Sequence, residues 1–315
     1  MKILITGGAG YIGGALTDIL KDSNHSVRVY DSLLYEENYR KDMDFIFGDI
    51  RDQDKLKKQL KWADTVVWLA ALVGDGACAL NPDIAVDINQ QSVKWLSSNF
   101  DGRIIFTSTC SVYGAQRTML DENSPAGPLS VYASSKLAAE EYLKHKNALI
   151  FRLGTLFGVG DLFSRIRLDL VVNIMTVRAF KEGELKVFGG EQYRPLLHVR
   201  DAARAIYENL DKTETGIFNL NKENIKMLDL SEIVRNHFPK LKIKTEKMEF
   251  QDSRNYRVKN QKAKNILKFE PKLSIDQGIE ELKQLLQENR IRDVNNERFS
   301  NNLFLTKFNT HLQKV

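Results

Sequence analysis

The amino-acid sequence predicts an α/β protein built on a doubly wound parallel sheet, and two observations carry this prediction. Short apolar strands alternate with amphipathic helices through the first half of the chain, as in a parallel sheet with helices on both faces. The chain also begins with a short apolar strand at residues 3–5, a glycine-rich turn and a helix at residues 11–20. Strand, glycine turn and helix in this order form a site for a pyrophosphate.

Length and composition are those of an ordinary globular protein. The 315 residues are 43% hydrophobic and 28% charged, which is enough for one large or two modest cores. No apolar run approaches the ~20 residues of a membrane span, and the glycine turn begins too early for a signal peptide to precede it. We therefore expect a cytosolic (cytoplasmic) protein with no membrane partner.

Charge and cysteine content limit the partners further. The net charge of +5 suits a phosphate-bearing ligand, although a solvated basic surface explains it more simply. Lysines 55, 57, 58 and 61 lie on a polar helix without interleaved aromatic residues, so we expect no nucleic-acid partner. Cys78 and Cys110 each stand alone and the five histidines are scattered, so we expect neither a disulfide framework nor a metal site.

The glycine turn and the end of the next strand predict the cofactor. Gly7, Gly10 and Gly13 allow a tight turn and a close approach of the backbone to phosphates. The second strand, at residues 27–31, ends in Asp31, roughly 20 residues beyond the glycines, where the dinucleotide fingerprint places its acid. A carboxylate there accepts hydrogen bonds from the adenosine ribose and repels a 2′-phosphate, which favours NAD over NADP.

The remaining elements suggest a division of the chain. Further strands are expected at residues 43–50, 65–71, 103–107 and 148–155, and helices at residues 82–99 and 131–146. Beyond these the alternation loosens, with helices expected at residues 169–181, 201–210, 230–237 and 275–288 and strands at residues 185–188, 196–199 and 216–220. We expect a dinucleotide-binding domain (1–165 and about 196–222), a smaller interleaved α/β substrate domain (166–195 and 223–290), and a carboxyl-terminal tail of unknown role (291–315).

A tyrosine and a lysine near the start of the helix at residues 131–146 form a candidate catalytic pair. Tyr132 and Lys136 are one helical turn apart, so the phenol and the ammonium share a face. A nearby cation lowers a tyrosine pKa from about 10, toward the range where the phenolate can accept a proton from an alcohol. Tyr142 and Lys146 repeat the spacing but are rotated by roughly 80° around the helix. We choose Tyr132 because it lies near the helix start.

These motifs occur in an order that resembles a known family. They are Gly7-x-x-Gly10-x-x-Gly13, Asp31, Asp49-Ile50, Leu69-Ala70-Ala71, residues 107–114, Tyr132-x-x-x-Lys136 and residues 194–201. With this set, the chain resembles the extended short-chain dehydrogenase/reductases and, more narrowly, the nucleotide-sugar epimerases and dehydratases. The resemblance implies an NAD-binding Rossmann domain, a smaller domain for a nucleoside diphosphate sugar, and a homodimer.

The resemblance also implies roles for individual residues. Tyr132 is the base that removes a proton from a sugar hydroxyl, Lys136 holds the nicotinamide ribose, and Thr109, with Ser108 as the alternative, hydrogen-bonds the reacting oxygen. The implied NAD contacts are Gly7, Gly10, Tyr11, Ile12, Gly13, Asp31, Asp49, Ile50, Leu69, Ala70, Ala71, Thr107, Tyr132 and Lys136. The implied substrate contacts are Val73, Thr109, Cys110, Asn173, Val187, Arg194 and Arg254. Arg165 and Arg167 are further candidates for the substrate diphosphate, with a surface arginine equally compatible.

The residues after Thr109 bear on the reaction. The 4,6-dehydratases carry an Asp-Glu pair there, and the sugar-acid decarboxylases usually carry a glutamate at the second position, whereas this chain has Cys110 and Ser111. The resemblance therefore implies oxidation at C4. The hydride either returns to the opposite face, as in a UDP-galactose 4-epimerase-like enzyme, or does not return, as in a dehydrogenase.

The sequence supports several further expectations. Residues 69–82 and 164–173 look like a bacterial surface-polysaccharide branch that includes enzymes oxidising C4 of GDP-heptoses, and Thr155 stands where family members often carry asparagine. His198 is expected to order the domain junction, and Cys78 to pack in the core. The alternative from another functional class is a noncatalytic dinucleotide-binding sensor, which has no use for a complete Thr109, Tyr132 and Lys136 set.

Overall fold

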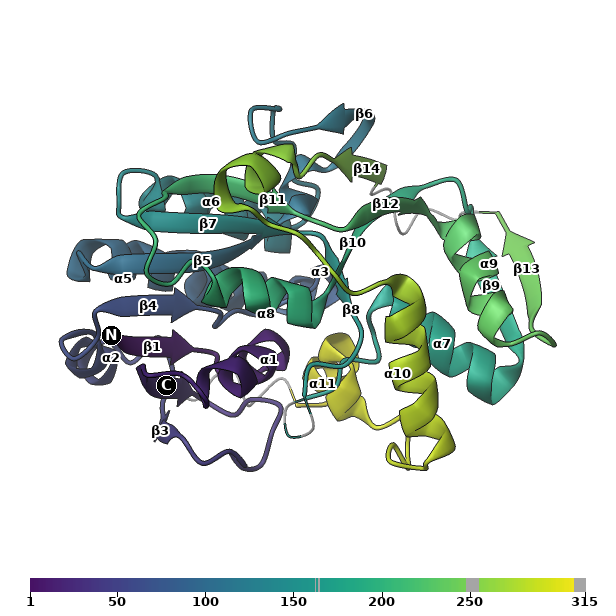
Figure 1. Cartoon of the computed structure of the whole chain (residues 1–315), viewed down its shortest axis with the longest axis horizontal. Helices are drawn as coiled ribbons and strands as arrows, with labels where there is room; N and C mark the ends of the chain where they lie inside the picture. The colour runs from purple at the N-terminus through teal and green to yellow at the C-terminus, as the bar shows by residue number, and fades with distance from the viewer. Residues whose placement is uncertain (162, 164, 248–254, 309–315) are drawn as a thin grey trace.

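A seven-stranded parallel sheet forms the centre of the molecule (Figure 1). The computed structural model describes residues 1–161, 163, 165–247 and 255–308. The strand order is β11-β7-β5-β4-β1-β2-β3, and every neighbouring pair is parallel. The strands are β1 (Lys2–Thr6), β2 (Ser26–Asp31), β3 (Asp44–Phe47), β4 (Thr65–Trp68), β5 (Arg103–Thr109), β7 (Ala148–Leu153) and β11 (Gly216–Leu220). This confirms the predicted doubly wound α/β fold.

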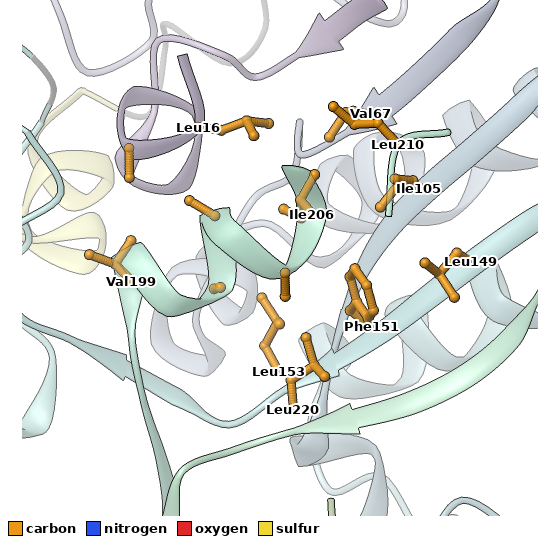
Figure 2. Packing of buried hydrophobic residues seen from close by; sticks show 14 of the residues in the cluster. Leu16, Val67, Ile105, Leu149, Phe151, Leu153, Val199, Ile206, Leu210 and Leu220 are labelled. Atoms are coloured by element: carbon orange, nitrogen blue, oxygen red, sulfur yellow. The ribbon is translucent and has the colours of Figure 1, made fainter. Parts of the chain in front are cut away.

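Helices cover both faces of this sheet because successive strand residues point to opposite sides. Ile3 and Ile5 of β1 join one core cluster with α1 (Tyr11–Leu20) and α8 (Val199–Tyr207), whereas Leu4 joins a second cluster. Figure 2 shows Leu16 of α1 and Ile206 of α8 in the first cluster. The second cluster is covered by α2 (Gln53–Leu60), α4 (Pro82–Val86), α5 (Ser92–Asn99) and α6 (Val131–Leu143).

Three small sheets, built mostly from the second half of the described chain, and a group of helices lie beside the large sheet (Figure 1). The sheets are β12-β10-β8, β13-β9 and β14-β6. Their strands are β6 (Ala115–Leu120), β8 (Thr155–Phe157), β9 (Glu184–Phe188), β10 (Tyr193–His198), β12 (Glu223–Lys226), β13 (Lys242–Glu246) and β14 (Asn255–Val258). The helices that pack together here are α7 (Val171–Glu182), α9 (Met227–His237) and α10 (Ile275–Gln287).

Several elements differ from the sequence prediction. The predicted helix at 82–99 is interrupted between α4 and α5 by a π-helical turn, η1 (Asp87–Gln91), and the predicted strand at 148–155 is divided into β7 and β8 at Gly154. The strands β6, β12, β13 and β14 were not predicted. Other short elements are α3 (Asp75–Leu80), η2 (Cys110–Tyr113), η3 (Ala263–Leu267) and η4 (Glu297–Phe299).

The expected carboxyl-terminal tail contains a packed helix. This helix, α11 (Asn301–Phe308), packs against α3. Its Leu305 is fully buried in the same core cluster as Leu72 and Cys78. Cys78 is also fully buried there, which confirms its predicted packing role. Of the helices that the structure describes, none combines the length and apolar character needed to cross a membrane.

Candidate functional site

The strand order reverses between β1 and β4, which is where open parallel sheets bind ligands. A cavity lies at this point, at the carboxyl ends of β1, β2 and β4. The predicted NAD contacts that line it are Gly7, Gly10, Tyr11, Ile12, Gly13, Asp31, Asp49, Ile50, Leu69, Ala70 and Ala71. Residues far apart in the sequence are thus brought together around one space.

Two positions of the glycine turn, Gly7 and Gly13, leave no room for a side chain. Gly7 has a φ of +74°, and a Cβ built on it would lie 2.5 Å from the backbone nitrogen of Ala70. A Cβ on Gly13 would lie 2.5 Å from the Cα of Gly8. Among the described residues no side chain caps the start of α1, so its first N–H groups are available to an anion. These features fit a dinucleotide pyrophosphate.

Asp31 connects the glycine turn to the end of β2. Its carboxylate accepts hydrogen bonds from the backbone N–H of Ala9 (3.0 Å) and of Leu33 (2.8 Å) while also lining the cavity. Burial raises the pKa of this carboxyl, and the backbone hydrogen bonds oppose that shift. Asp31 therefore holds the turn in shape from the position that was predicted to meet the adenosine ribose.

The helix α6 brings Lys136 to the carboxyl end of β5. Ser130 caps this helix by accepting from the N–H of Ala133 at 3.2 Å. The Lys136 ammonium is only 2% exposed and donates to the Thr107 carbonyl at 2.9 Å. Burial lowers the pKa of Lys136 to about 8. Thr107 and Lys136 are thus in direct contact, although neither lines the cavity.

The Tyr132 phenol has a different pKa from the one that its spacing predicted. Burial raises this pKa above its ordinary value, and Cys78 and Asp75 act in the same direction, while a hydrogen bond with Thr109 opposes the shift. The prediction of a lowered tyrosine pKa is therefore wrong for this structure. The helical spacing indicated that a cation is near, but it contained no information on how deeply the phenol is buried.

Neighbouring hydroxyls on β5 have different surroundings. The Ser108 hydroxyl donates to Glu140 at 2.5 Å, inside a buried network with Arg152. The Thr109 hydroxyl accepts from the N–H of Ser111 at 3.1 Å and interacts with the Tyr132 phenol. Of the two alternatives for the hydroxyl beside the base, the geometry favours Thr109.

The predicted substrate contacts are dispersed. Val73 lines the cavity, whereas Val187 is 2% exposed within the core formed by α7, α9 and α10. The Cys110 thiol is fully buried and donates to the Arg152 carbonyl at 3.2 Å, which places its side chain in the core. Arg254 lies outside the described residues.

Two more of these predicted contacts make hydrogen bonds to backbone. Asn173 accepts from the N–H of Gly158 at 2.9 Å and donates to the Arg167 carbonyl at 2.7 Å. Arg194 is 4% exposed on β10, and its guanidinium donates to the Tyr193 carbonyl at 2.9 Å. Their roles toward a substrate stay predictions.

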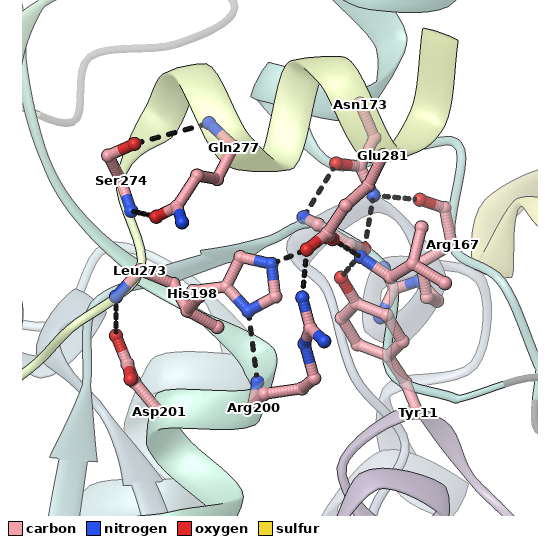
Figure 3. A network of polar contacts seen from close by, with 12 residues as sticks. Tyr11, Arg167, Asn173, His198, Arg200, Asp201, Leu273, Ser274, Gln277 and Glu281 are labelled. Atoms are coloured by element: carbon pink, nitrogen blue, oxygen red, sulfur yellow. Dashed lines mark hydrogen bonds and ion pairs between the residues drawn. The ribbon is translucent and has the colours of Figure 1, made fainter. Parts of the chain in front are cut away.

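A polar network connects the small sheets to the cavity (Figure 3). The Tyr11 hydroxyl donates to the Gly158 carbonyl at 2.5 Å, and His198 Nε2 lies 3.1 Å from a Glu281 oxygen. His198 Nδ1 accepts from the N–H of Arg200 at 3.2 Å. Burial lowers the pKa of His198 to about 3, so the ring is neutral and donates from Nε2 to Glu281. As predicted, His198 orders this junction.

Other residues on the cavity were not predicted as cofactor contacts. Arg165 and Arg167 line it together with Tyr35 and Asn301. Both arginines are candidates for the substrate diphosphate from the sequence, with a surface position equally compatible, and the structure places them in the same cavity as the glycine turn. Asn301 belongs to the segment that matched no family motif, so the sequence carried no signal for its position.

Comparison with known proteins agrees with this geometry. The model of the NAD-dependent epimerase/dehydratase family matches residues 3–220. A protein of Methanocaldococcus jannaschii, provisionally named UDP-glucose 4-epimerase, is 32% identical over 224 residues, which cover 64% of this chain and 71% of that protein. UDP-glucuronic acid decarboxylase 1 of Arabidopsis thaliana is 26% identical over 300 residues, with coverages of 89% and 68%.

A solved structure shows the same fold. The UDP-glucose 4-epimerase of Thermotoga maritima, determined with UDP-glucose, superposes with a TM-score of 0.80 at 24% identity. The match covers 92% of this chain and 100% of that one. The similarity therefore extends beyond the large sheet into the second half of the molecule.

Proposed function

The chain belongs to the NAD-dependent epimerase/dehydratase family, and within this family we propose that it is a nucleotide-sugar 4-epimerase acting through transient oxidation at C4. The observation that carries the proposal is the set formed by Thr109, Tyr132 and Lys136 at the carboxyl end of β5. The Tyr132 phenol interacts with Thr109, and Lys136 is anchored on Thr107. NAD, the cofactor of the family, supplies the hydride acceptor when bound.

Each of these residues has a definable task. Thr109 orients the reacting hydroxyl and the phenol with respect to each other, which makes the proton transfer effectively intramolecular. Tyr132 accepts the proton of the sugar hydroxyl. Because burial raises the pKa of Tyr132, the ionised phenol needs a compensating charge. The Lys136 ammonium, one helical turn away, supplies it.

The residues beside Thr109 support a 4-epimerase over the other reactions of the family. Elimination of water needs an additional acid and base, and this chain has a buried thiol at Cys110 and a hydroxyl at Ser111. The Ser111 hydroxyl lies 3.2 Å from that of Tyr256, so no carboxylate occupies that position. The provisional name of the Methanocaldococcus relative and the name of the Thermotoga structure both give UDP-glucose 4-epimerase, and they support the same reaction and a nucleoside diphosphate sugar as substrate.

The experiment supplies the enzyme with UDP-, GDP-, dTDP- and CDP-sugars and follows the absorbance of reduced nicotinamide together with NMR of the products. A C4-inverted sugar without net reduction of NAD is the expected result. Accumulating NADH with a keto-sugar would instead identify a C4 dehydrogenase, such as one acting on a GDP-heptose. No reaction across the panel would support a noncatalytic sensor.

A matched pair of variants tests the assignment of the base. Tyr132→Phe should lower kcat by roughly 10²- to 10⁴-fold, the usual contribution of a general base. Tyr142→Phe is the control, because Tyr142 lies on the same helix, ten residues further on, and its hydroxyl contacts Gln90. Equal turnover in the two variants would contradict the assignment.

The remaining parts of the proposal concern assembly and location. The family resemblance supports a homodimer that acts in the cytosol on precursors of surface glycans. Sedimentation equilibrium of the purified protein and fractionation of the source cells test these two points.

A further inference from the structure

The carboxyl-terminal segment, residues 297–308, reaches the cavity through Asn301, which is one of its lining residues. The Asn301 side chain donates to the Val73 carbonyl at 2.7 Å, and its backbone N–H donates to Asp169 at 2.9 Å. Leu305 is fully buried beneath α3 and anchors the segment in the core. The segment therefore connects two walls of the cavity, at residues 72–73 and 165–169.

Arg165 is held by this segment. Its Nη1 donates to the Asn301 side-chain oxygen at 2.5 Å, and its Nε donates to the Arg298 carbonyl at 2.7 Å. The guanidinium lies 3.7 Å from the ring centre of Tyr35. Arg165 is only 5% exposed, and its Nη2 has no hydrogen-bond partner in the described part of the chain.

The charge of Arg165 is not neutralised by a direct partner. Its hydrogen-bond acceptors are a backbone carbonyl and an amide oxygen, which carry no net charge. Arg167, which also lines the cavity, is itself paired with Asp169 at 2.6 and 2.9 Å. Burial and the positive charge of Arg167 lower the pKa of Arg165 to about 10, although Tyr35, Asp169 and Glu36 act in the opposite direction. A buried cation in this state is stabilised when an anion binds beside it.

The shape of the cavity indicates which anion this is. Arg165 lines the same space as the glycine turn, whose N–H groups are oriented to bind a pyrophosphate. A guanidinium presents a planar fork that bridges two phosphate oxygens. We propose that Arg165 is a second binding residue for the pyrophosphate of NAD, and that the carboxyl-terminal segment holds it in position for this contact.

The proposal depends on NAD binding alone and holds whichever sugar reaction the enzyme performs. Its test measures the Kd of NAD, of ADP-ribose and of adenosine for the wild type, for Arg165→Met and for the control Arg292→Met. Arg292 is an exposed arginine in the same part of the chain. For Arg165→Met we expect Kd to rise roughly 10- to 100-fold for NAD and ADP-ribose, as for the loss of a hydrogen-bonded charge. Adenosine, which has no phosphate, should bind all three proteins equally.

Two further measurements keep the proposal falsifiable. Asn301→Leu removes one anchor of Arg165, and a rise of roughly 3- to 10-fold in the Kd of NAD is expected for a weakened charged hydrogen bond. If Arg165→Met does not fold, as judged by circular dichroism, Arg165→Lys replaces it, since lysine keeps the charge but not the fork. An unchanged Kd for NAD in the folded arginine variant would overturn the proposal.

The same variants distinguish NAD from the substrate as the source of the phosphate. The Kd of UDP is measured with the protein saturated with NAD, and Arg165→Met should leave it unchanged. A higher Kd for UDP in Arg165→Met, together with an unchanged Kd for NAD, would assign Arg165 to the substrate diphosphate and overturn the proposal. Loss of the 4-epimerase reaction in the sugar panel would affect neither measurement.

Discussion

Two arginines of this protein are buried to the same extent but in opposite electrostatic surroundings. Arg152 on β7 and Arg165 before α7 are each 5% exposed. Glu140 binds Arg152 with contacts of 2.6 and 3.0 Å, and Ser108 completes the network. Burial disfavours the charge of Arg152, but Glu140 outweighs it and raises the pKa of the guanidinium. Among the described residues no carboxylate is hydrogen-bonded to Arg165, and although Asp169 and Glu36 act on it from a distance, its pKa is lowered.

The difference separates a structural arginine from a ligand-binding one. Each guanidinium has one nitrogen without a hydrogen bond among the described residues, Nη1 in Arg152 and Nη2 in Arg165, so an unsatisfied N–H is not the distinguishing feature. The distinguishing features are the carboxylate beside the charge and the cavity in front of it. A carboxylate, that of Glu140, lies beside Arg152, whereas Arg165 faces the cavity.

The largest effect is expected from breaking the buried ion pair of Glu140 and Arg152. Glu140→Gln leaves the Arg152 charge buried without its counter-charge, and removing one partner of a buried pair costs about 3–5 kcal/mol. Urea-induced unfolding of the ligand-free protein should show this loss in the free energy of unfolding. Glu141→Gln is the control, because this neighbouring side chain is 62% exposed, and a change within about 0.5 kcal/mol is expected. Equal stability of the two variants would show that the pair contributes no more than a surface contact.

His198 provides a third case, a buried group that stays neutral, and its expected effect is the next largest. The unfolded chain protonates a histidine near pH 6.5, whereas the folded protein does so only near pH 3. The stability associated with the neutral ring is therefore complete above pH 6.5 and is lost as the pH falls toward 3. The slope is at most about 1.4 kcal/mol per pH unit.

Urea unfolding between neutral and mildly acidic pH measures this slope. His198→Gln should remove its share of the acid destabilisation, whereas the exposed His145→Gln should retain the wild-type pH dependence. A wild-type slope in His198→Gln would mean that other groups cause the loss of stability.

The large sheet and the glycine turn could be predicted because their signals are local. Strand, turn and helix lie within the first 20 residues, and alternating elements predict a parallel sheet from their order alone. Even the choice between Ser108 and Thr109 has a local basis, since adjacent strand residues point to opposite faces. In the structure Ser108 contacts Glu140 of α6, and Thr109 contacts Tyr132.

The position of the carboxyl-terminal segment could not be predicted because its contacts are remote. Asn301 bonds Val73, 228 positions away, and neither residue belongs to a periodic pattern that would indicate the other. The direction of the Tyr132 pKa shift could not be predicted for a similar reason. The helical spacing predicted a cation on the same face of the helix, but burial, which depends on the whole packed structure, decides the direction of the shift.

The last prediction decides whether Arg165 really differs from Arg152. In the ligand-free protein, Arg165→Met removes a charge with no directly bonded carboxylate among the described residues. The free energy of unfolding should therefore change by less than about 1 kcal/mol, in contrast to Glu140→Gln. With saturating NAD, the wild type should gain more stability than the variant. The difference is about 1.4 kcal/mol for each tenfold change in Kd.

Urea unfolding with and without NAD measures both quantities on the same proteins. If ligand-free Arg165→Met loses about 3 kcal/mol or more of its free energy of unfolding, Arg165 has a structural role like that of the Glu140–Arg152 ion pair. Its contacts with Arg298 and Asn301 would then be stabilising the fold. A small loss without NAD and a clear loss with it would assign the stability of this region to the cofactor, since the buried charge then gains its partner only on binding.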